Sequence, residues 1–255
     1  MRHHRLLLLV ALPVLLASPA RASDDDPAYD GWITMGGNRI AVHWDDGDSF
    51  TFLSGPRKGM PTRLVGFNTL ESYGPVHRWG DWTAEDLWAV AKESPKFAAS
   101  ATWECTTRGK KDAYKRLLVD CPQLRVDMVG KGLAHVFAYD EPADPRLLEV
   151  QKKARIAERG MWAKGRPEQI VTSVHDNHGA GGALRIVAGR TGETEMVGQA
   201  VELSICEEVC HGDPWRGSCM VYVPFKLRYG DHKAECLQGA PPSLEDAMAT
   251  APPKD

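Results

Sequence analysis

The stretch RIAVHWDDGDSFTFL, residues 39–53, decides how the first part of this chain folds. Apolar and polar residues alternate over residues 40–44, and the alternation returns over residues 50–52. A period of two is typical of a β-strand with one buried face, and Asp-Asp-Gly at 45–47 is a tight-turn signal. The stretch therefore predicts a β-hairpin, and residues 62–67 predict a third strand of the same meander.

The pattern beyond this meander mixes helices with short strands. Capping residues, acidic first turns and apolar faces indicate helices. The expected helices are residues 82–93, 124–131 and 145–159, and the expected strands are residues 101–106 and 117–121. Five short strands interrupted by helices predict a β-rich α+β fold. The OB-fold, a five-stranded Greek-key barrel with packed helices, fits this count.

Charged and polar side chains gather in three short segments, residues 45–50, 63–71 and 112–116. Together they offer two guanidiniums, a carboxylate free for proton transfer, and an oxygen-rich pair for a hard cation. Phosphodiester hydrolysis needs such groups, because charge builds on the non-bridging oxygens as water attacks in line. Each segment alone is a weak signal, but the three in this order predict a site that cuts phosphodiesters.

The N-terminus has the features of a secretory signal peptide, expected at residues 1–22. A basic start is followed by an apolar run from Leu6 to Ala17 and an Ala-x-Ala end. The run is short for a membrane span, and a retained anchor is the alternative reading. Cleavage predicts an exported protein, periplasmic or extracellular, with no membrane contact afterwards. The acidic residues 23–31 are an expected flexible lead-in.

Net charge gives two opposite indications about nucleic acid. Loss of three arginines with the signal peptide changes the formal net charge from −3 to −6, whereas nucleic-acid binders are usually basic. Five basic residues nevertheless fall within residues 108–116. Because a binding groove needs local rather than global positive potential, nucleic acid stays a candidate partner.

Residues 40–162, roughly half of the chain, resemble the staphylococcal nuclease (thermonuclease) family. The matching residues are Asp46-Gly47-Asp48, Arg63-Leu64, Asn68-Thr69-Leu70-Glu71, Asp112-x-Tyr114-x-Arg116, Ala154-Arg155 and Arg159-Gly160-Met161-Trp162. The resemblance implies an OB-fold domain, expected at residues 32–165. It also implies Ca²⁺-dependent hydrolysis of DNA and RNA with little sequence specificity, preferably of single strands. The resemblance implies no particular protein partner.

The resemblance implies a Ca²⁺ site in the first two polar segments. Asp48 would bind the ion together with Asn68 and the backbone carbonyl of Thr69, and Asp46 would support Asp48 from behind. Ca²⁺ prefers oxygen ligands, and the charge of the ligands tunes its affinity. The family usually has Asp where this chain has Asn68. The missing charge predicts weaker binding, with a different metal preference or lost activity as alternatives.

The resemblance also implies the groups that act on the substrate. Arg63 and Arg116 would hold the phosphate, because a guanidinium can bind two oxygens and stays protonated. Glu71 would accept the proton of the attacking water. Tyr114 would line the nucleotide pocket, and Lys115, where the family usually has glycine, would contact the substrate.

All six cysteines lie beyond the signal peptide, which is typical of an exported, disulfide-bonded chain. Cys105 and Cys121 enclose the Asp-x-Tyr-x-Arg loop and are expected to pair, as is common among exported members of the family. They also flank a predicted hairpin. Such a bond would stiffen the loop that carries Arg116.

The remaining cysteines define a small β-rich unit, expected at residues 166–240 with strands at 202–210 and 219–229. Two disulfides are favoured over a zinc site that includes His211 or His232, because the spacing is not that of a common zinc site. Three pairings stay open. Residues 241–255 are an expected disordered tail. The four cysteines are Cys206, Cys210, Cys219 and Cys236.

Other functions are consistent with the same residues. A catalytically inactive nuclease-like module that binds nucleic acid or an envelope partner is supported by Asn68 and the acidic net charge. An envelope protein that works through its C-terminal unit is a further alternative. The Asp-rich turn is also consistent with a plain polar turn, and Arg63 with Glu71 with a buried structural ion pair. The histidines show no ligand spacing and are expected in structural or surface positions.

Overall fold

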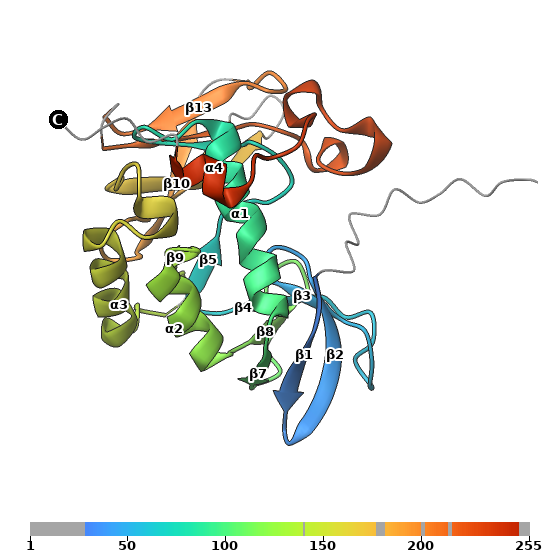
Figure 1. The fold of residues 1–255 in the computed structure, drawn as a ribbon. Helices are drawn as coiled ribbons and strands as arrows, with labels where there is room; N and C mark the ends of the chain where they lie inside the picture. The colour runs from blue at the N-terminus through green and yellow to red at the C-terminus, as the bar shows by residue number, and fades with distance from the viewer. Residues whose placement is uncertain (1–28, 140, 177–181, 200–201, 214–215, 250–255) are drawn as a thin grey trace, which may run out of the picture.

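The computed structural model describes residues 29–139, 141–176, 182–199, 202–213 and 216–249 (Figure 1). The expected signal peptide lies outside these residues, as do most of the lead-in and His178. Within the described ranges, no helix is both long enough and apolar enough to cross a membrane.

Four strands form the N-terminal sheet: β1 (Asp30–Met35), β2 (Asn38–Trp44), β3 (Phe50–Phe52) and β7 (Thr102–Cys105). Their order is β3-β2-β1-β7, with β7 parallel to β1 and the other pairs antiparallel. The hairpin expected at 39–53 is confirmed as β2 and β3. Gly47 in its turn has a φ of 93°. A Cβ at Gly47 would lie 2.8 Å from the Ser94 Cβ, so glycine lets the turn pack against the core.

The third strand expected at residues 62–67 is in fact two strands, β4 (Thr62–Leu64) and β5 (Phe67–Thr69). Gly66 separates them with a φ of 86°, and the bend gives each strand a different partner. β4 pairs in parallel with β8 (Leu117–Val119), and β5 pairs antiparallel with β9 (Ala134–Val136). The described strands thus form open sheets in a mixed α+β fold, and the five-stranded barrel is not confirmed.

Three helices pack on these strands: α1 (Ala84–Ala99), α2 (Pro122–Lys131) and α3 (Pro145–Ile156). Thr83 caps α1 by accepting a hydrogen bond from the Asp86 N–H at 3.1 Å. The helix continues past its expected end at Glu93, because Ser94, Pro95 and Ala98 are buried there. α2 ends at Gly132, one of its two expected stops, with a φ of 71°.

One hydrophobic core joins the sheet, the helices and the short 3-10 helix η2 (Gly160–Trp162). The Met161 carbonyl accepts hydrogen bonds from the indole N–H groups of Trp79 (3.2 Å) and Trp82 (2.9 Å). These two hydrogen bonds attach the end of the nuclease-like segment to the residues just before α1. The largest fully buried side chains include Trp44, Phe50, Phe52, Phe67, Leu87 and Trp162.

The C-terminal region contains more strands than its sequence predicted. The three-stranded sheet β10-β11-β12 had no expected counterpart, and the strands expected at 202–210 and 219–229 are shorter. β14 pairs with β6 at Met220↔His77 and Cys219↔Arg78, so this region shares a sheet with the nuclease-like part. The bounds are β6 (His77–Arg78), β10 (Gln169–Asp176), β11 (Gly182–Ala188), β12 (Thr194–Gln199), β13 (Glu208–His211), β14 (Ser218–Val221), η3 (Phe225–Leu227), η4 (Gly230–His232) and η5 (Glu235–Leu237).

Three disulfides engage all six cysteines. Cys105 bonds to its expected partner Cys121. Of the three pairings open for the remaining four, the structure has Cys206–Cys236 and Cys210–Cys219. Cys210 and Cys219 face each other across β13 and β14. With every sulfur in a disulfide, none is available as a zinc ligand.

The segment expected to be a disordered tail contains a short helix, α4 (Leu244–Ala249). It lies against α1 (Figure 1), and Ala247 is fully buried in the main core. The expectation of disorder was therefore wrong for these residues. A Pro- and Ala-rich composition suggested a free tail, but apolar burial against α1 decides otherwise. Residues 250–255 lie outside the described part of the chain.

Candidate functional site

Arg63 on β4 binds two side chains from other segments. Asp48 lies in the turn between β2 and β3, and Asn68 lies on β5, beyond the bend at Gly66. Arg63 Nη1 donates to Asp48 Oδ1, and its Nη2 donates to Asn68 Oδ1 at 2.5 Å. The Asp48 side chain is 2% exposed and that of Arg63 is 14% exposed. Arg63 forms its ion pair with Asp48 and not with Glu71, which was the alternative expectation. The hairpin turn and the end of β5 thus meet at one guanidinium.

Thr69 and Asp46 hold this cluster from the other side. The Thr69 N–H donates to Asp48 Oδ2 at 2.8 Å, and the Thr69 hydroxyl donates to the Asp46 carbonyl at 2.8 Å. The Ser49 hydroxyl donates to Asp46 Oδ1 at 2.6 Å. Burial, followed by the charges of Asp48 and Glu71, raises the pKa of Asp46 well above its ordinary value. Asp46 and Asp48 are thus both hydrogen-bonded to Thr69.

Glu71 places a half-buried carboxylate beside the cluster. Among the described residues its side chain has no hydrogen bond or ion pair, while its backbone N–H donates to His77 Nε2 at 3.1 Å. Loss of water contact is the main cause that raises its pKa, and the charge of Asp48 adds to it. Arg228, Arg185 and Arg63 act in the opposite direction. An unpaired carboxylate with a raised pKa is suited to accept a proton.

Two histidines that the sequence placed in structural roles hold the site residues. His77 accepts the Glu71 N–H, and His135 Nε2 lies 3.5 Å from the Asn68 amide nitrogen while its Nδ1 is 2.9 Å from the Val136 carbonyl. Burial lowers the pKa of His77 to about 3 and that of His135 to about 4. Both are neutral and act as structural acceptors. Their positions in short apolar strands carried no signal of this contact.

The basic loop is ordered by one acidic side chain. Asp112 accepts hydrogen bonds from the Tyr114 N–H (3.0 Å), the Arg116 N–H (2.9 Å) and the Arg116 Nε (2.8 Å). Tyr114 is 72% exposed, and Lys115 is exposed with a φ of 66°. The Arg116 guanidinium lies 5.6 Å from the Tyr114 ring. Among the described residues, no hydrogen bond or ion pair joins Arg116 to Asp48 or Arg63; its carboxylate partner is Asp112.

The oxygens of the cluster fit Ca²⁺ in kind. Asp48 Oδ1 and Asn68 Oδ1 converge on one guanidinium, which is the position of a single positive charge. Hard oxygen donors of this type suit Ca²⁺. The Thr69 carbonyl, the third expected ligand, accepts a hydrogen bond from Asn68 Nδ2 at 2.6 Å. A bound ion would compete with the Arg63 guanidinium for these oxygens, whereas the Thr69 carbonyl has a second lone pair beside the one that accepts from Asn68.

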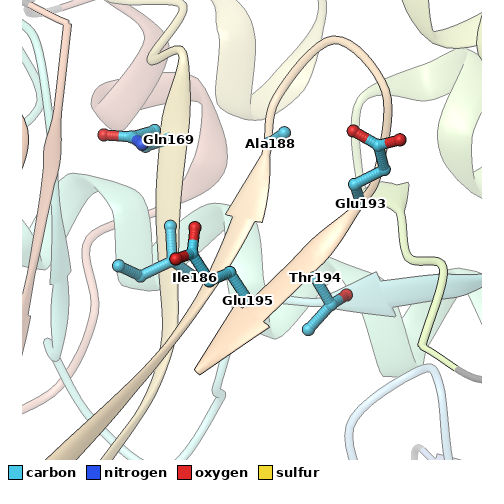
Figure 2. A pocket seen from close by; sticks show the side chains of 6 residues that line it. All are labelled: Gln169, Ile186, Ala188, Glu193, Thr194 and Glu195. Atoms are coloured by element: carbon cyan, nitrogen blue, oxygen red, sulfur yellow. The ribbon is translucent and has the colours of Figure 1, made fainter. Parts of the chain in front are cut away.

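Two other features are not candidates for this chemistry. Within the described ranges, one group of three His, Cys or carboxylate atoms has metal-like spacing, Glu208 with Cys210 and Cys219, but its sulfurs form a disulfide. A hollow of about 130 Å³ lies on the β10–β11–β12 sheet, with Glu193 and Glu195 in its wall (Figure 2). Acidic walls repel phosphate, and none of the predicted site residues lines it.

A guanidinium that binds two side-chain oxygens, near an unpaired carboxylate, is an arrangement that suits phosphate and cation chemistry. Residues 61–164 match the family described as staphylococcal nuclease homologue, so this part of the chain is a domain of that family. The family's fold is the OB-fold, and its members are generally nucleases, typically calcium-dependent. No curated protein matches the chain. Asp48 precedes the matched residues, and Arg185 and Arg228 follow them.

Proposed function

We propose that this protein is an exported, Ca²⁺-dependent nuclease that hydrolyses phosphodiester bonds of DNA and RNA with little sequence specificity. The observation that carries the proposal is the convergence of Asp48, Asn68 and Arg63 beside the unpaired carboxylate of Glu71. A nuclease needs an anion-binding cation, oxygen ligands and a base within one small site. The residues that supply these three parts lie in two separate segments of the sequence, residues 45–50 and 63–71.

Arg63 would bind the phosphate that is cut. Its side chain is 14% exposed, and a guanidinium fork can face the charge that develops on the non-bridging oxygens. Removal of one such donor typically costs about 2.7–4 kcal/mol of transition-state stabilisation. Arg116 would bind the same phosphate after a movement of the loop, because Asp112 holds its Nε at 2.8 Å in this structure.

Glu71 would take the proton of the attacking water. Its carboxylate has no partner among the described residues, and His77 fixes its backbone. Asp48, Asn68 and the Thr69 carbonyl would hold Ca²⁺, with Asp46 behind them. When bound, the ion would supply Lewis-acid polarisation of the phosphate and orient it.

Aromatic and basic side chains around the site would bind single strands. Tyr114 is 72% exposed and Tyr139 is 63% exposed, and Tyr139 stacks on Phe137 with an interplanar angle of 4°. Base stacking on such rings tolerates any sequence, since every base has a π-face. Lys115 would add a phosphate contact from the same loop as Tyr114.

The domain boundaries and location belong to the same proposal. Residues 1–22 would direct export and be removed, and the three disulfides support folding in an oxidising compartment. Residues 32–165 would form the OB-fold domain. Isolated bridges at Thr51↔Pro61 and Thr106↔Asp120 support closure of its sheets into a barrel. Residues 166–240 would form the C-terminal unit.

A nuclease-like module that binds nucleic acid without cutting it is the alternative. The hydrogen bond from Asn68 Nδ2 to the Thr69 carbonyl favours it, because it occupies an expected ligand with a neutral side chain. Loss of one ligand charge weakens Ca²⁺ affinity.

Digestion of single-stranded DNA by the purified mature protein separates these functions. The assay is run with Ca²⁺, with a chelator, and with a Glu71→Gln variant beside the wild type. Cutting that needs Ca²⁺ and is lost in the variant supports the nuclease. DNA binding without cutting at any Ca²⁺ or Mn²⁺ concentration would overturn it in favour of the binding module.

A further inference from the structure

The C-terminal region is attached to the walls of the candidate site. The Ala138 N–H donates to the Gly192 carbonyl at 2.8 Å, and Gln151 Nε2 donates to the Gly189 carbonyl at 3.0 Å. Gln151 Oε1 also accepts the Val136 N–H at 2.6 Å. The turn between β11 and β12 is thereby held against the strand that continues into Phe137.

Arg185 on β11 reaches the candidate site. Its guanidinium carbon lies 5.2 Å from the centre of the Phe137 ring, and that of Arg63 lies 5.5 Å from the same centre. Two guanidiniums from different regions of the chain therefore share one aromatic ring. The bridge between Ala138 and Glu193 joins the turn before β12 to the segment that follows β9.

Thr172 orients Arg185 without neutralising it. The Arg185 Nε donates to the Thr172 hydroxyl at 3.0 Å, and Nη2 donates to the Thr172 carbonyl at 3.3 Å. No other hydrogen bond or ion pair in the described residues engages the guanidinium, so Nη1 has no partner there. A half-buried arginine that is held by neutral groups and has donors to spare is prepared for an anion.

The charges around Arg185 are those of the candidate site. Burial is the main cause that lowers its pKa, and the charge of Arg63 lowers it further, while Glu71 and Asp48 raise it. Two cations that repel each other in this way are stabilised by a shared anion. Neither carboxylate forms an ion pair with Arg185, and one of them is already bound to Arg63.

We propose that Arg185 binds a phosphate oxygen of the nucleic-acid substrate beside Arg63, so that the C-terminal region completes the substrate site. The inference rests on the proposed function, and it adds a residue outside the family-matched segment 61–164. It gives the C-terminal region a role in binding substrate. It also gives the site a second guanidinium, that of Arg185, while Arg116 is paired with Asp112.

The test compares Arg185→Gln, Arg185→Lys and the control Arg190→Gln in the full chain. Arg190 lies just beyond β11 with a side chain that is 75% exposed. Binding of a fluorescein-labelled oligothymidylate is measured with a chelator present over a range of salt, and cleavage is measured with Ca²⁺. Thermal unfolding shows that each variant is folded.

Arg185→Gln is expected to reduce the slope of log affinity against log salt by about 0.7, the value for one phosphate contact on a single strand. It is also expected to reduce kcat/KM by about 10²-fold. Arg185→Lys should keep the salt slope, and Arg190→Gln should keep both values.

An unchanged salt slope in folded Arg185→Gln would overturn the inference, whatever happens to cleavage, because a merely structural arginine leaves the number of phosphate contacts constant. If the wild type binds DNA but does not cut it, the nuclease proposal fails, and the salt slope still decides about Arg185. A wild type that neither binds nor cuts would overturn both.

Discussion

Arg63 and Asp48 form a buried ion pair in which the arginine also binds Asn68, so a side chain supplies the positive charge between the two expected cation ligands. The same guanidinium is the one expected to bind substrate phosphate. In this structure the guanidinium binds the Asp48 carboxylate instead. A cation that takes its place would release Arg63 for the phosphate.

Replacement of Arg63 by Gln should therefore strengthen Ca²⁺ binding while it abolishes cutting. A gain of about tenfold corresponds to removal of a competing interaction of about 1.4 kcal/mol. Isothermal titration of Ca²⁺ into wild type and variant measures it, with the surface variant Arg57→Gln as control. Weaker Ca²⁺ binding in Arg63→Gln would show that the two cations do not compete.

Asn68→Asp should also tighten Ca²⁺ binding, because it adds a ligand charge and removes the amide that occupies the Thr69 carbonyl. Without Ca²⁺ the same change places a second carboxylate close to buried Asp48 and should lower the unfolding temperature. Asn38→Asp, at the exposed start of β2, is the matched control. Ca²⁺ titrations followed by thermal unfolding check both effects, and equal affinity in the two proteins would exclude Asn68 as a ligand.

His77 makes stability depend on pH. Its pKa is lowered to about 3 in the folded protein from an ordinary 6.5, mainly by burial, so the unfolded chain takes up the proton first as pH falls. Stability should drop between pH 6.5 and 3, by up to about 1.4 kcal/mol per pH unit for this residue. The raised pKa values of Asp46 and Glu71 act in the opposite direction, because protonation of these groups favours the folded state.

The contribution of His77 is isolated by His77→Gln, which retains an acceptor for the Glu71 N–H. Between pH 6.5 and 5 the variant should lose less stability than the wild type, by up to about 2 kcal/mol. Urea unfolding at both pH values measures this, with exposed His232→Gln as control. The same pH dependence in His77→Gln and wild type would contradict the prediction.

The Cys105–Cys121 disulfide should stabilise both the fold and the loop of Arg116. It spans a sequence separation of 16, and its removal by a double Ala variant should cost about 3 kcal/mol. Removal of Cys210–Cys219, with a separation of 9, should cost about 2.6 kcal/mol. Cleavage measured well below both unfolding temperatures should fall only in the first variant, and equal loss in both would argue against a role for the loop.

Lys164 and Asp86 form a buried ion pair at 2.9 Å, with the Lys164 side chain 1% exposed. Lys164→Met should destabilise the protein by about 3–5 kcal/mol, because it leaves a buried charge without its partner. The double variant with Asp86→Leu should recover most of this loss. Urea unfolding of the three proteins tests the coupling, and a double variant no more stable than Lys164→Met would refute it.

Local sequence was sufficient for much of the fold and for part of the site. The hairpin of residues 39–53 follows from its alternation and its Asp-Asp-Gly turn, and the start of α1 follows from Thr83. The three polar segments were predicted to form one site, and the structure joins the first two around Arg63. Arg116 shows the limit, because nothing in the sequence indicated that Asp112 would pair with its side chain.

Neighbouring residues by themselves determined the turns, the caps and the strand alternation of this protein, since each of these depends on interactions within a few positions along the chain. Only the tertiary structure decided which distant groups meet. It brought Arg185 to the Phe137 ring, His77 to the Glu71 backbone and Ala247 to α1. The physical reason is that strand pairing and burial against remote surfaces depend on the whole packed core, which no local pattern encodes.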